Sequence, residues 1–86
     1  DADINSADVK KAAQFAVSQH RRKKKDGAKL ISINNAYQQI VAGLNYKLCL
    51  RVKIKGRTRN ITAVVYKNLQ GKYSLTSWKN ESECTI

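Results

Sequence analysis

Residues 44–54, Leu-Asn-Tyr-Lys-Leu-Cys-Leu-Arg-Val-Lys-Ile, decide the fold of this 86-residue chain. Large apolar side chains occupy every second position from Leu44 to Ile54, and the positions between them are basic or polar apart from Cys49. Successive side chains of a β-strand point to opposite faces, so this pattern predicts a strand with one apolar and one basic face. The apolar face needs a second element to cover it.

The segment that precedes residue 27 predicts a covering helix. Ser6 or Asn5 can cap its start, and Asp26-Gly27 supplies its end. Between them one stripe recurs with the 3–4 spacing of a helix, formed by Val9, Ala12, Ala13, Ala16, Val17 and His20. Because most of this stripe is alanine, we expect the helix to lie close to the sheet, where the larger strand side chains fill the space.

The rest of the chain predicts further strands joined by short turns. Residues 30–41, 61–66 and 73–78 are strand-like, and residues 56–59 and 68–71 have the composition of turns. We therefore expect an α+β fold in a single domain over residues 1–86. It consists of one N-terminal helix packed on an antiparallel sheet of four to five strands.

The charge is large and unevenly placed. The formal net charge is +11, and between Gly27 and Asn80 the chain carries ten lysines and arginines and no acid. Such a surface attracts anionic polymers and acidic membranes, although the same charge is also compatible with a solvated surface that only keeps the protein soluble. The candidate cations are Arg21, Arg22, Lys23, Lys24 and Lys25, then Lys47, Arg51, Lys53, Lys55, Arg57 and Arg59, which we expect on the outer face and turn of one hairpin.

Nucleic acid is the least favoured of these anionic partners. Binding of single strands depends on aromatic side chains interleaved with the cations, and the outer face of residues 44–54 carries none.

The two cysteines point to an oxidising compartment. By the alternation above, Cys49 lies on the outer face, and the C-terminal tail can bring Cys84 across it; we predict a disulfide between them. Two glycosylation sequons, Asn60-Ile61-Thr62 and Asn80-Glu81-Ser82, agree with a secreted protein. We therefore expect an extracellular location.

Catalysis and metal binding are not expected. Cys49 and His20 are the only candidates for a nucleophile and a base, and the predicted elements place them on different surfaces. One histidine and two cysteines without a close spacing do not make a zinc site, so we expect no metal and no cofactor.

One loop has unusual chemistry. In Gln38–Tyr46, Gln-Gln-Ile-Val-Ala-Gly-Leu-Asn-Tyr, two strand-like runs meet at Val-Ala-Gly instead of the Asn-Gly or Asp-Gly typical of tight hairpins. An apolar tip such as Val41 is costly in water and favourable when buried in a partner. The alternative is that Val41 folds back onto its own protein.

The chain resembles the cystatins over nearly its whole length. Gln39–Gly43 matches the family's Gln-x-Val-x-Gly motif, and Leu44-Asn45-Tyr46 matches the start of the strand that follows it. Lys10–Val17 resembles the family's helix signature around Phe-Ala-Val, and Tyr66–Gly71 occupies the position of the second binding hairpin.

This resemblance implies a reversible, tight-binding inhibitor of papain-like, cathepsin-type cysteine proteases. In cystatins an N-terminal segment and two hairpins form a wedge that enters the active-site cleft. Carried over to this chain, the wedge comprises Asp1 and Ala2, then Gln39, Ile40, Val41, Ala42 and Gly43, then Asn68, Leu69 and Gln70.

The chain also departs from the family pattern. The second hairpin of cystatins carries Pro-Trp, where this chain has Asn68-Leu69, and the Cys49/Cys84 pair differs from the usual pairing. An aromatic anchor is therefore replaced by a smaller apolar one, and weaker inhibition is expected. The alternative function is a cystatin-fold basic protein that binds anionic surfaces, as an antimicrobial or heparin-binding protein, with weak or no protease inhibition.

Overall fold

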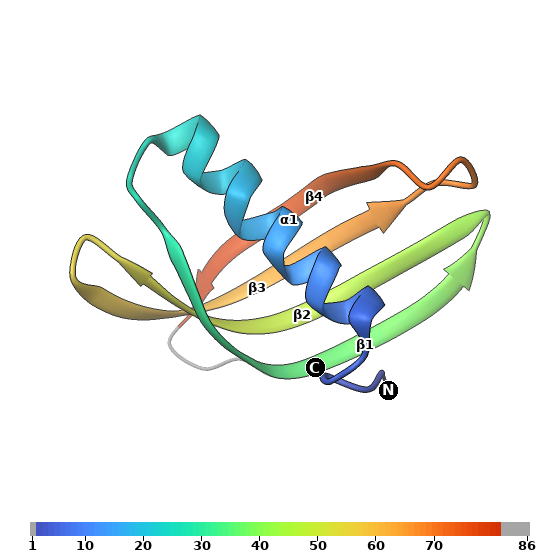
Figure 1. The fold of residues 1–86 in the computed structure, drawn as a ribbon, viewed down its shortest axis with the longest axis horizontal. Coiled ribbons are helices and arrows are strands. Elements are labelled where there is room, and N and C mark those ends of the chain that lie inside the picture. Colours follow the sequence, from blue (N-terminus) through green and yellow to red (C-terminus); the bar gives the residue numbers. More distant parts are fainter. Residues whose placement is uncertain (1, 82–86) are drawn as a thin grey trace.

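The computed structural model describes residues 2–81 and shows one helix lying across one face of a four-stranded antiparallel sheet (Figure 1). The elements are α1 (Ala7–Lys24), β1 (Lys29–Val41), β2 (Gly43–Ile54), β3 (Arg57–Lys67) and β4 (Tyr73–Glu81). The strands lie side by side in chain order, each antiparallel to the next. The predicted α+β fold is confirmed, with four strands.

Helix α1 has a capping hydrogen bond at each end. The Ser6 hydroxyl caps the start by accepting a hydrogen bond from the Val9 N–H at 3.2 Å. At the other end Lys25 adopts a left-handed conformation, with φ at 51°, and its N–H donates to the Arg21 carbonyl at 2.7 Å. The helix therefore stops one residue before the predicted Asp26-Gly27.

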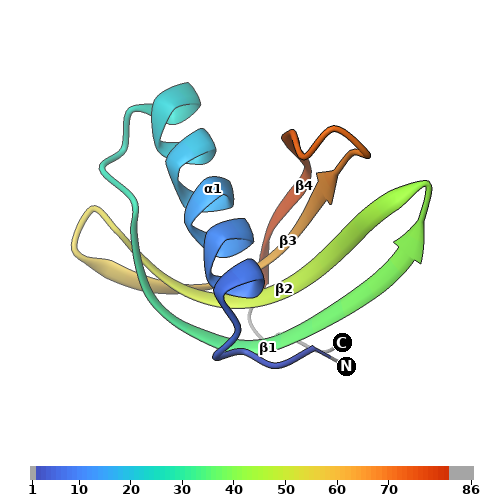
Figure 2. The same ribbon diagram turned by 45° about the vertical axis from the view of Figure 1, so that its right-hand side comes forward.

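The alanine stripe of α1 faces the sheet. Figure 2 shows the helix crossing the concave face of the curved sheet. Small helix side chains meet larger strand side chains there. The fully buried set comprises Ala12, Ala13 and Ala16 of the helix with Ala36, Tyr46, Leu48, Leu50, Val52, Ile61, Ala63 and Val65 of the sheet. Burying each large apolar side chain contributes about 1.5–3 kcal/mol, so this layer supplies most of the hydrophobic stabilisation.

The turn between β2 and β3 differs from the prediction. Sequence composition placed a turn at residues 56–59, whereas the structure turns at Lys55-Gly56 and has Arg57 already paired with Ile54. Both turn residues have positive φ, 51° for Lys55 and 80° for Gly56. Positive φ at both central residues is the requirement of the tight hairpin turn that matches strand twist.

The two ends of the sheet are formed by different elements. At one end lie the β1–β2 hairpin and the β3–β4 loop; at the other lie the C-terminal end of α1 and the β2–β3 hairpin (Figures 1 and 2). The chain measures 37 Å along its longest axis. Over residues 2–81, no helix combines the length and apolar character that a membrane span requires.

Candidate functional site

The two loops at the first end of the sheet enclose an open groove. It has a volume of about 480 Å³ and is lined by Ile40, Val41, Gly43, Leu44, Lys67, Asn68, Leu69, Gln70 and Gly71. These residues come from segments more than 20 positions apart in the sequence, and the strand pairing β1–β2–β3–β4 brings them together. We call this surface, both loops included, the two-loop edge.

Apolar side chains project from the two-loop edge into solvent. Ile40 is 80% exposed, Leu69 is 77% exposed and Val41 is 43% exposed. The most exposed of them on the first hairpin is therefore Ile40, while Val41 is turned partly toward the groove. An exposed apolar edge of this kind is typical of a surface that binds a partner.

The first hairpin is held by two contacts to the neighbouring strand β3. The Tyr66 hydroxyl donates a hydrogen bond to the Ala42 carbonyl at the hairpin tip. Gly43 has φ at 109°, and a Cβ placed on it would lie 2.4 Å from the Lys67 carbonyl oxygen. Only glycine fits this close approach, so Gly43 and Tyr66 fix the position of the tip relative to the second loop.

The second loop is organised by Asn68. Its side-chain oxygen accepts hydrogen bonds from the N–H groups of Gln70 and Lys72, at 3.0 and 2.9 Å, and its backbone N–H donates to the Lys72 carbonyl at 2.9 Å. The Asn68 side chain is therefore used within the loop, and Leu69 is the side chain that the loop presents outward. The sequence predicted that Asn68 contacts the partner. The structural role of this residue was also indicated there, because asparagine followed by Leu-Gln-Gly is typical of a turn.

Two other predicted wedge residues, Ala2 and Gln39, do not line the groove. The Ala2 N–H donates to the Ala36 carbonyl at 3.0 Å, beside the middle of β1, about 17 Å of strand from Val41. Gln39 is exposed directly opposite Asn45, and its side chain makes no hydrogen bond to another described residue. Asp1 lies outside the described residues.

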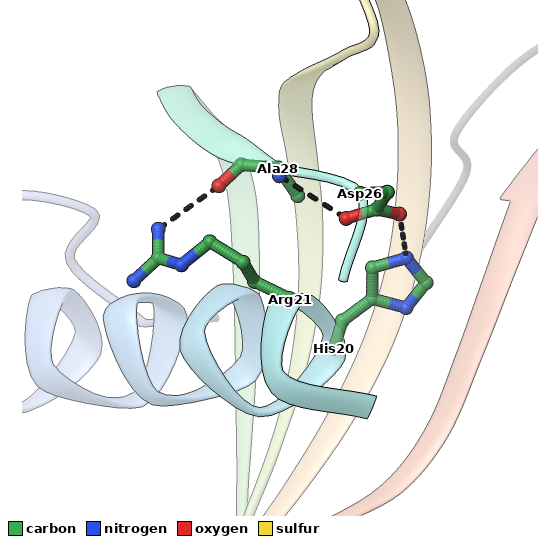
Figure 3. A network of polar contacts seen from close by, with 4 residues as sticks. All are labelled: His20, Arg21, Asp26 and Ala28. Atoms are coloured by element: carbon green, nitrogen blue, oxygen red, sulfur yellow. Dashed lines mark hydrogen bonds and ion pairs between the residues drawn. The ribbon is translucent and has the colours of Figure 1, made fainter. Parts of the chain in front are cut away.

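A polar network links the C-terminal end of α1 to residues 26–28, just before β1 (Figure 3). Nε2 of His20 lies 2.8 Å from Oδ2 of Asp26, the other oxygen of Asp26 accepts from the Ala28 N–H at 3.1 Å, and Arg21 donates to the Ala28 carbonyl at 3.0 Å. The His20 ring also stacks on Trp78, with centroids 4.1 Å apart. The prediction that His20 is a helix-end residue packed against the sheet is confirmed, and sequence analysis missed its pairing with Asp26.

The environment of Asp26 lowers its pKa. Burial on its own would raise it, but the hydrogen bonds from the Ala28 N–H and from His20, with the charge of His20, more than offset that penalty. Asp26 is therefore ionised, and its two carboxylate oxygens are hydrogen-bonded to His20 and to the Ala28 N–H.

The outer face of the sheet carries Cys49, which is 2% exposed between Asn35 of β1 and Thr62 of β3. Its placement on the outer face agrees with the alternation of the strand. Cys84 lies outside the described residues, so the Cys49–Cys84 disulfide stays a prediction. A thiol assay that finds two free sulfhydryls in the native protein would contradict it.

The predicted basic surface is corrected in one respect. Lys47, Arg51 and Lys53 lie on the outer face as expected. Arg57 and Arg59, however, are the cross-strand partners of Ile54 and Val52, and directly opposed residues point to the same face. These two arginines therefore lie on the helix side, because β3 begins immediately after the two-residue turn. Across residues 2–81, no group of three potential metal ligands occurs.

Comparison with known proteins relates this geometry to inhibitors. A protein-family model described as aspartic acid proteinase inhibitor matches residues 2–81. Cysteine proteinase inhibitor 1 of Actinidia chinensis var. chinensis is 41% identical over 63 residues, 73% of this chain and 54% of the relative. Cysteine proteinase inhibitor 3 of Arabidopsis thaliana is 32% identical over 62 residues, 72% of this chain and 50% of the relative.

A third relative, cysteine proteinase inhibitor 8 of Oryza sativa subsp. japonica, is 27% identical over 84 residues, 96% of this chain and 62% of the relative. The chain spans about half to three-fifths of the length of these relatives. The family match covers nearly the whole chain, and the fold is the predicted helix on an antiparallel sheet. The chain therefore belongs to the family described as aspartic acid proteinase inhibitor and is a member of the cystatins.

Proposed function

We propose that the chain is a reversible, tight-binding proteinase inhibitor that inserts its two-loop edge into the active-site cleft of its target. The observation that supports this most strongly is the convergence of Ile40, Val41 and Leu69, exposed apolar side chains from two separate loops, around one groove. Apolar side chains clustered at the centre of an interface supply most of the binding free energy in protein complexes.

The backbone of the edge suits inhibition without cleavage. Tyr66 and Gly43 hold the first hairpin, and Asn68 holds the second loop. A loop that is already ordered loses little conformational entropy on docking, so more of its contact energy appears as affinity. A hairpin tip that cannot extend also does not present its peptide bonds in the geometry that a protease cleaves.

Papain-like cysteine proteases of the cathepsin type are the first proposed target. The relatives from three plants are named cysteine proteinase inhibitors, and residues 39–43 carry the Gln-x-Val-x-Gly pattern. Leu69 offers a smaller contact than an aromatic residue would, so we propose a weaker complex than one with tryptophan at that position.

Aspartic proteinases are the second proposed target. The family model that matches residues 2–81 is described by that activity. Lys67 is the one charged residue lining the groove, and its ammonium lies 5.6 Å from the centre of the Tyr73 ring. A cation at the groove complements the paired carboxylates of an aspartic proteinase better than the Cys–His pair of a papain-like enzyme.

One titration distinguishes these targets. Active papain and a pepsin-like aspartic proteinase are each titrated with the native chain, Val41→Asp and Ile31→Asp. Ile31 is the matched control because it is a 50% exposed apolar residue of the same strand, ten positions from Val41.

We expect Val41→Asp to lose inhibition and Ile31→Asp to retain it, and the enzyme that responds identifies the target class. If the native chain inhibits neither papain nor the pepsin-like proteinase, the proposed function is wrong. An equal loss of inhibition in Val41→Asp and Ile31→Asp would show that the two-loop edge is not the binding surface.

A further inference from the structure

The end of the sheet opposite the two-loop edge is strongly cationic. Figure 1 shows the C-terminal end of α1, the start of β1 and the β2–β3 hairpin at this end, and these elements carry eight exposed basic residues. We call this set the basic end; it comprises Lys23, Lys24, Lys25, Lys29, Lys53, Lys55, Arg57 and Arg59.

The cations of the basic end outnumber the neighbouring acid, Asp26, which lines the same hollow as Lys29, Lys53 and Lys55. Asp26 is the acid nearest to it in the chain, and its two carboxylate oxygens are used by His20 and the Ala28 N–H. Within residues 2–81, the ion pair that forms is His20–Asp26, and none of the eight cations takes part in it. The charge is therefore open to a ligand from solution.

Lysines are crowded at this end at a cost to the fold. Lys29 and Lys53 are directly opposed cross-strand partners, and like charges in that arrangement are destabilising. With Lys55 they line a hollow of about 330 Å³, completed by Asp26, Gly27 and Gly56. An anionic group held in this hollow would offset the repulsion between Lys29 and Lys53. Anion binding would therefore stabilise the folded hairpin at this end.

The basic end continues around both faces of the hairpin. Lys53 lies on the outer face, whereas Arg57 and Arg59, opposite Ile54 and Val52, lie on the helix side. A ligand that follows this surface needs several regularly spaced negative groups, not a single one. Lysine ammonium groups are point charges that impose no planar geometry, so carboxylates and sulfates both suit them.

We propose that the basic end binds a linear anionic polysaccharide, with carboxylate or sulfate groups seated between Lys29, Lys53 and Lys55. The alternatives are less well matched. The large apolar side chains exposed on residues 2–81 are Ile31, Tyr37, Ile40, Val41 and Leu69, and of these only Ile31 lies in the segment that borders the basic end. Membrane insertion lacks an apolar patch there. The aromatic side chain beside the basic end is Trp78, which lines a hollow with Lys23 and Lys24, but it is partly buried and its ring is already stacked on His20, so it is a poor platform for nucleic-acid bases.

This site goes beyond the proposed function and does not depend on it. It lies at the other end of the 37 Å molecule from the groove, so its binding is measured without a proteinase. Inhibition can fail while polysaccharide binding persists, and the reverse is equally observable.

The test compares two charge-matched triple variants on immobilised heparin, a sulfated chain, and on polygalacturonate, a carboxylated one. The first variant is Lys29→Gln/Lys53→Gln/Lys55→Gln. The control is Lys10→Gln/Lys11→Gln/Lys79→Gln, which removes the same charge from exposed lysines of α1 and β4 that lie outside the basic end.

At about 0.15 M salt we expect the first variant to bind at least one of the polysaccharides about tenfold more weakly than the native chain, and the control to lose less than about threefold. The first variant keeps its fold because the change removes repulsion between lysines. The double variant Arg57→Gln/Arg59→Gln tests separately whether the helix side of the basic end contributes to polysaccharide binding. Equal losses in variant and control, native binding to neither polysaccharide, or tighter native binding to phosphatidylserine vesicles or single-stranded DNA would overturn the proposal.

Discussion

Replacement of Gly43 by alanine tests how the first hairpin is held. Gly43 has φ at 109°, and an added Cβ would lie 2.4 Å from the Lys67 carbonyl oxygen and 3.2 Å from the Asn68 Cα. Both of these are backbone atoms, so the contact cannot be relieved by a side-chain rotation. The hairpin must instead move away from β3, which also breaks the hydrogen bond from Tyr66 to the Ala42 carbonyl.

The expected loss of stability has two parts. Forcing a residue with a side chain into positive φ costs about 1–2 kcal/mol. Loss of the Tyr66 hydrogen bond and of the close packing adds about 1–2 kcal/mol. Gly56 provides the matched control, because its φ is 80° but nothing lies within 4 Å of an added Cβ. Gly56→Ala should therefore show only the first part, about 1–2 kcal/mol.

Thermal melting and inhibition are measured on both variants. For a domain of this size each kcal/mol lowers Tm by about 4–8 °C, so the difference between the two variants is resolvable. We expect Gly43→Ala to melt lower than Gly56→Ala and to lose inhibition, while Gly56→Ala inhibits normally. Equal melting temperatures, together with full inhibition by Gly43→Ala, would refute the idea that close approach to β3 positions the tip.

Three further changes test other parts of the structure. Asp26→Asn should lower stability by about 1 kcal/mol near pH 7. Because the pKa of Asp26 is lowered in the folded protein, this contribution is complete above the ordinary aspartate pKa of about 3.9 and is lost as pH falls through the folded value. A difference in Tm between the native chain and Asp26→Asn that is as large at about pH 2 as at pH 7 would contradict this. Tyr46→Phe should leave stability unchanged or raise it by up to about 1 kcal/mol, because the buried hydroxyl has no hydrogen-bond partner among residues 2–81; a clear fall in Tm would show that the hydroxyl is satisfied. Leu69→Trp should tighten papain inhibition about five- to tenfold by restoring an aromatic contact at a 77% exposed position; unchanged inhibition would place Leu69 outside the interface.

Hydrophobic periodicity predicted the architecture because it is a local property of the chain. The alanine stripe of α1 and the alternation from Leu44 to Ile54 each identify one buried face, and two such faces can be covered only by packing on one another. Strand β1 is less regular than β2: its pairing with β2 shifts register between Leu30 and Ser32 and again between Ile33 and Asn35.

Turn geometry was predicted less well. Composition suggested a turn that continued through Arg57 and Arg59, but strand pairing extends to Arg57 and leaves Lys55 with positive φ. Lysine is not a typical residue for that conformation, so sequence preference alone favoured the wrong boundary. As a consequence, Arg57 and Arg59 lie on the helix side of the sheet and not on the predicted outer face and turn.

The candidate site was predicted in its loops but not in its supports. The Gln39–Gly43 pattern and the loop at Leu69 were visible in the sequence. Three supporting contacts were not visible in it: the hydrogen bond from Tyr66 to Ala42, those that the Asn68 side chain accepts within its loop, and the pairing of His20 with Asp26. They depend on loop conformations that no sequence period encodes. The position of Ala2 beside Ala36, away from the groove, likewise follows from tertiary contacts.

The most direct test of the central claim is the inhibition constant of the native chain compared with Val41→Asp, measured on papain and on a pepsin-like proteinase. A carboxylate buried in a protease cleft without a partner costs several kcal/mol, so inhibition of the target should weaken by at least about 100-fold. Inhibition by Val41→Asp equal to that of the native chain would contradict the claim that the two-loop edge enters the cleft.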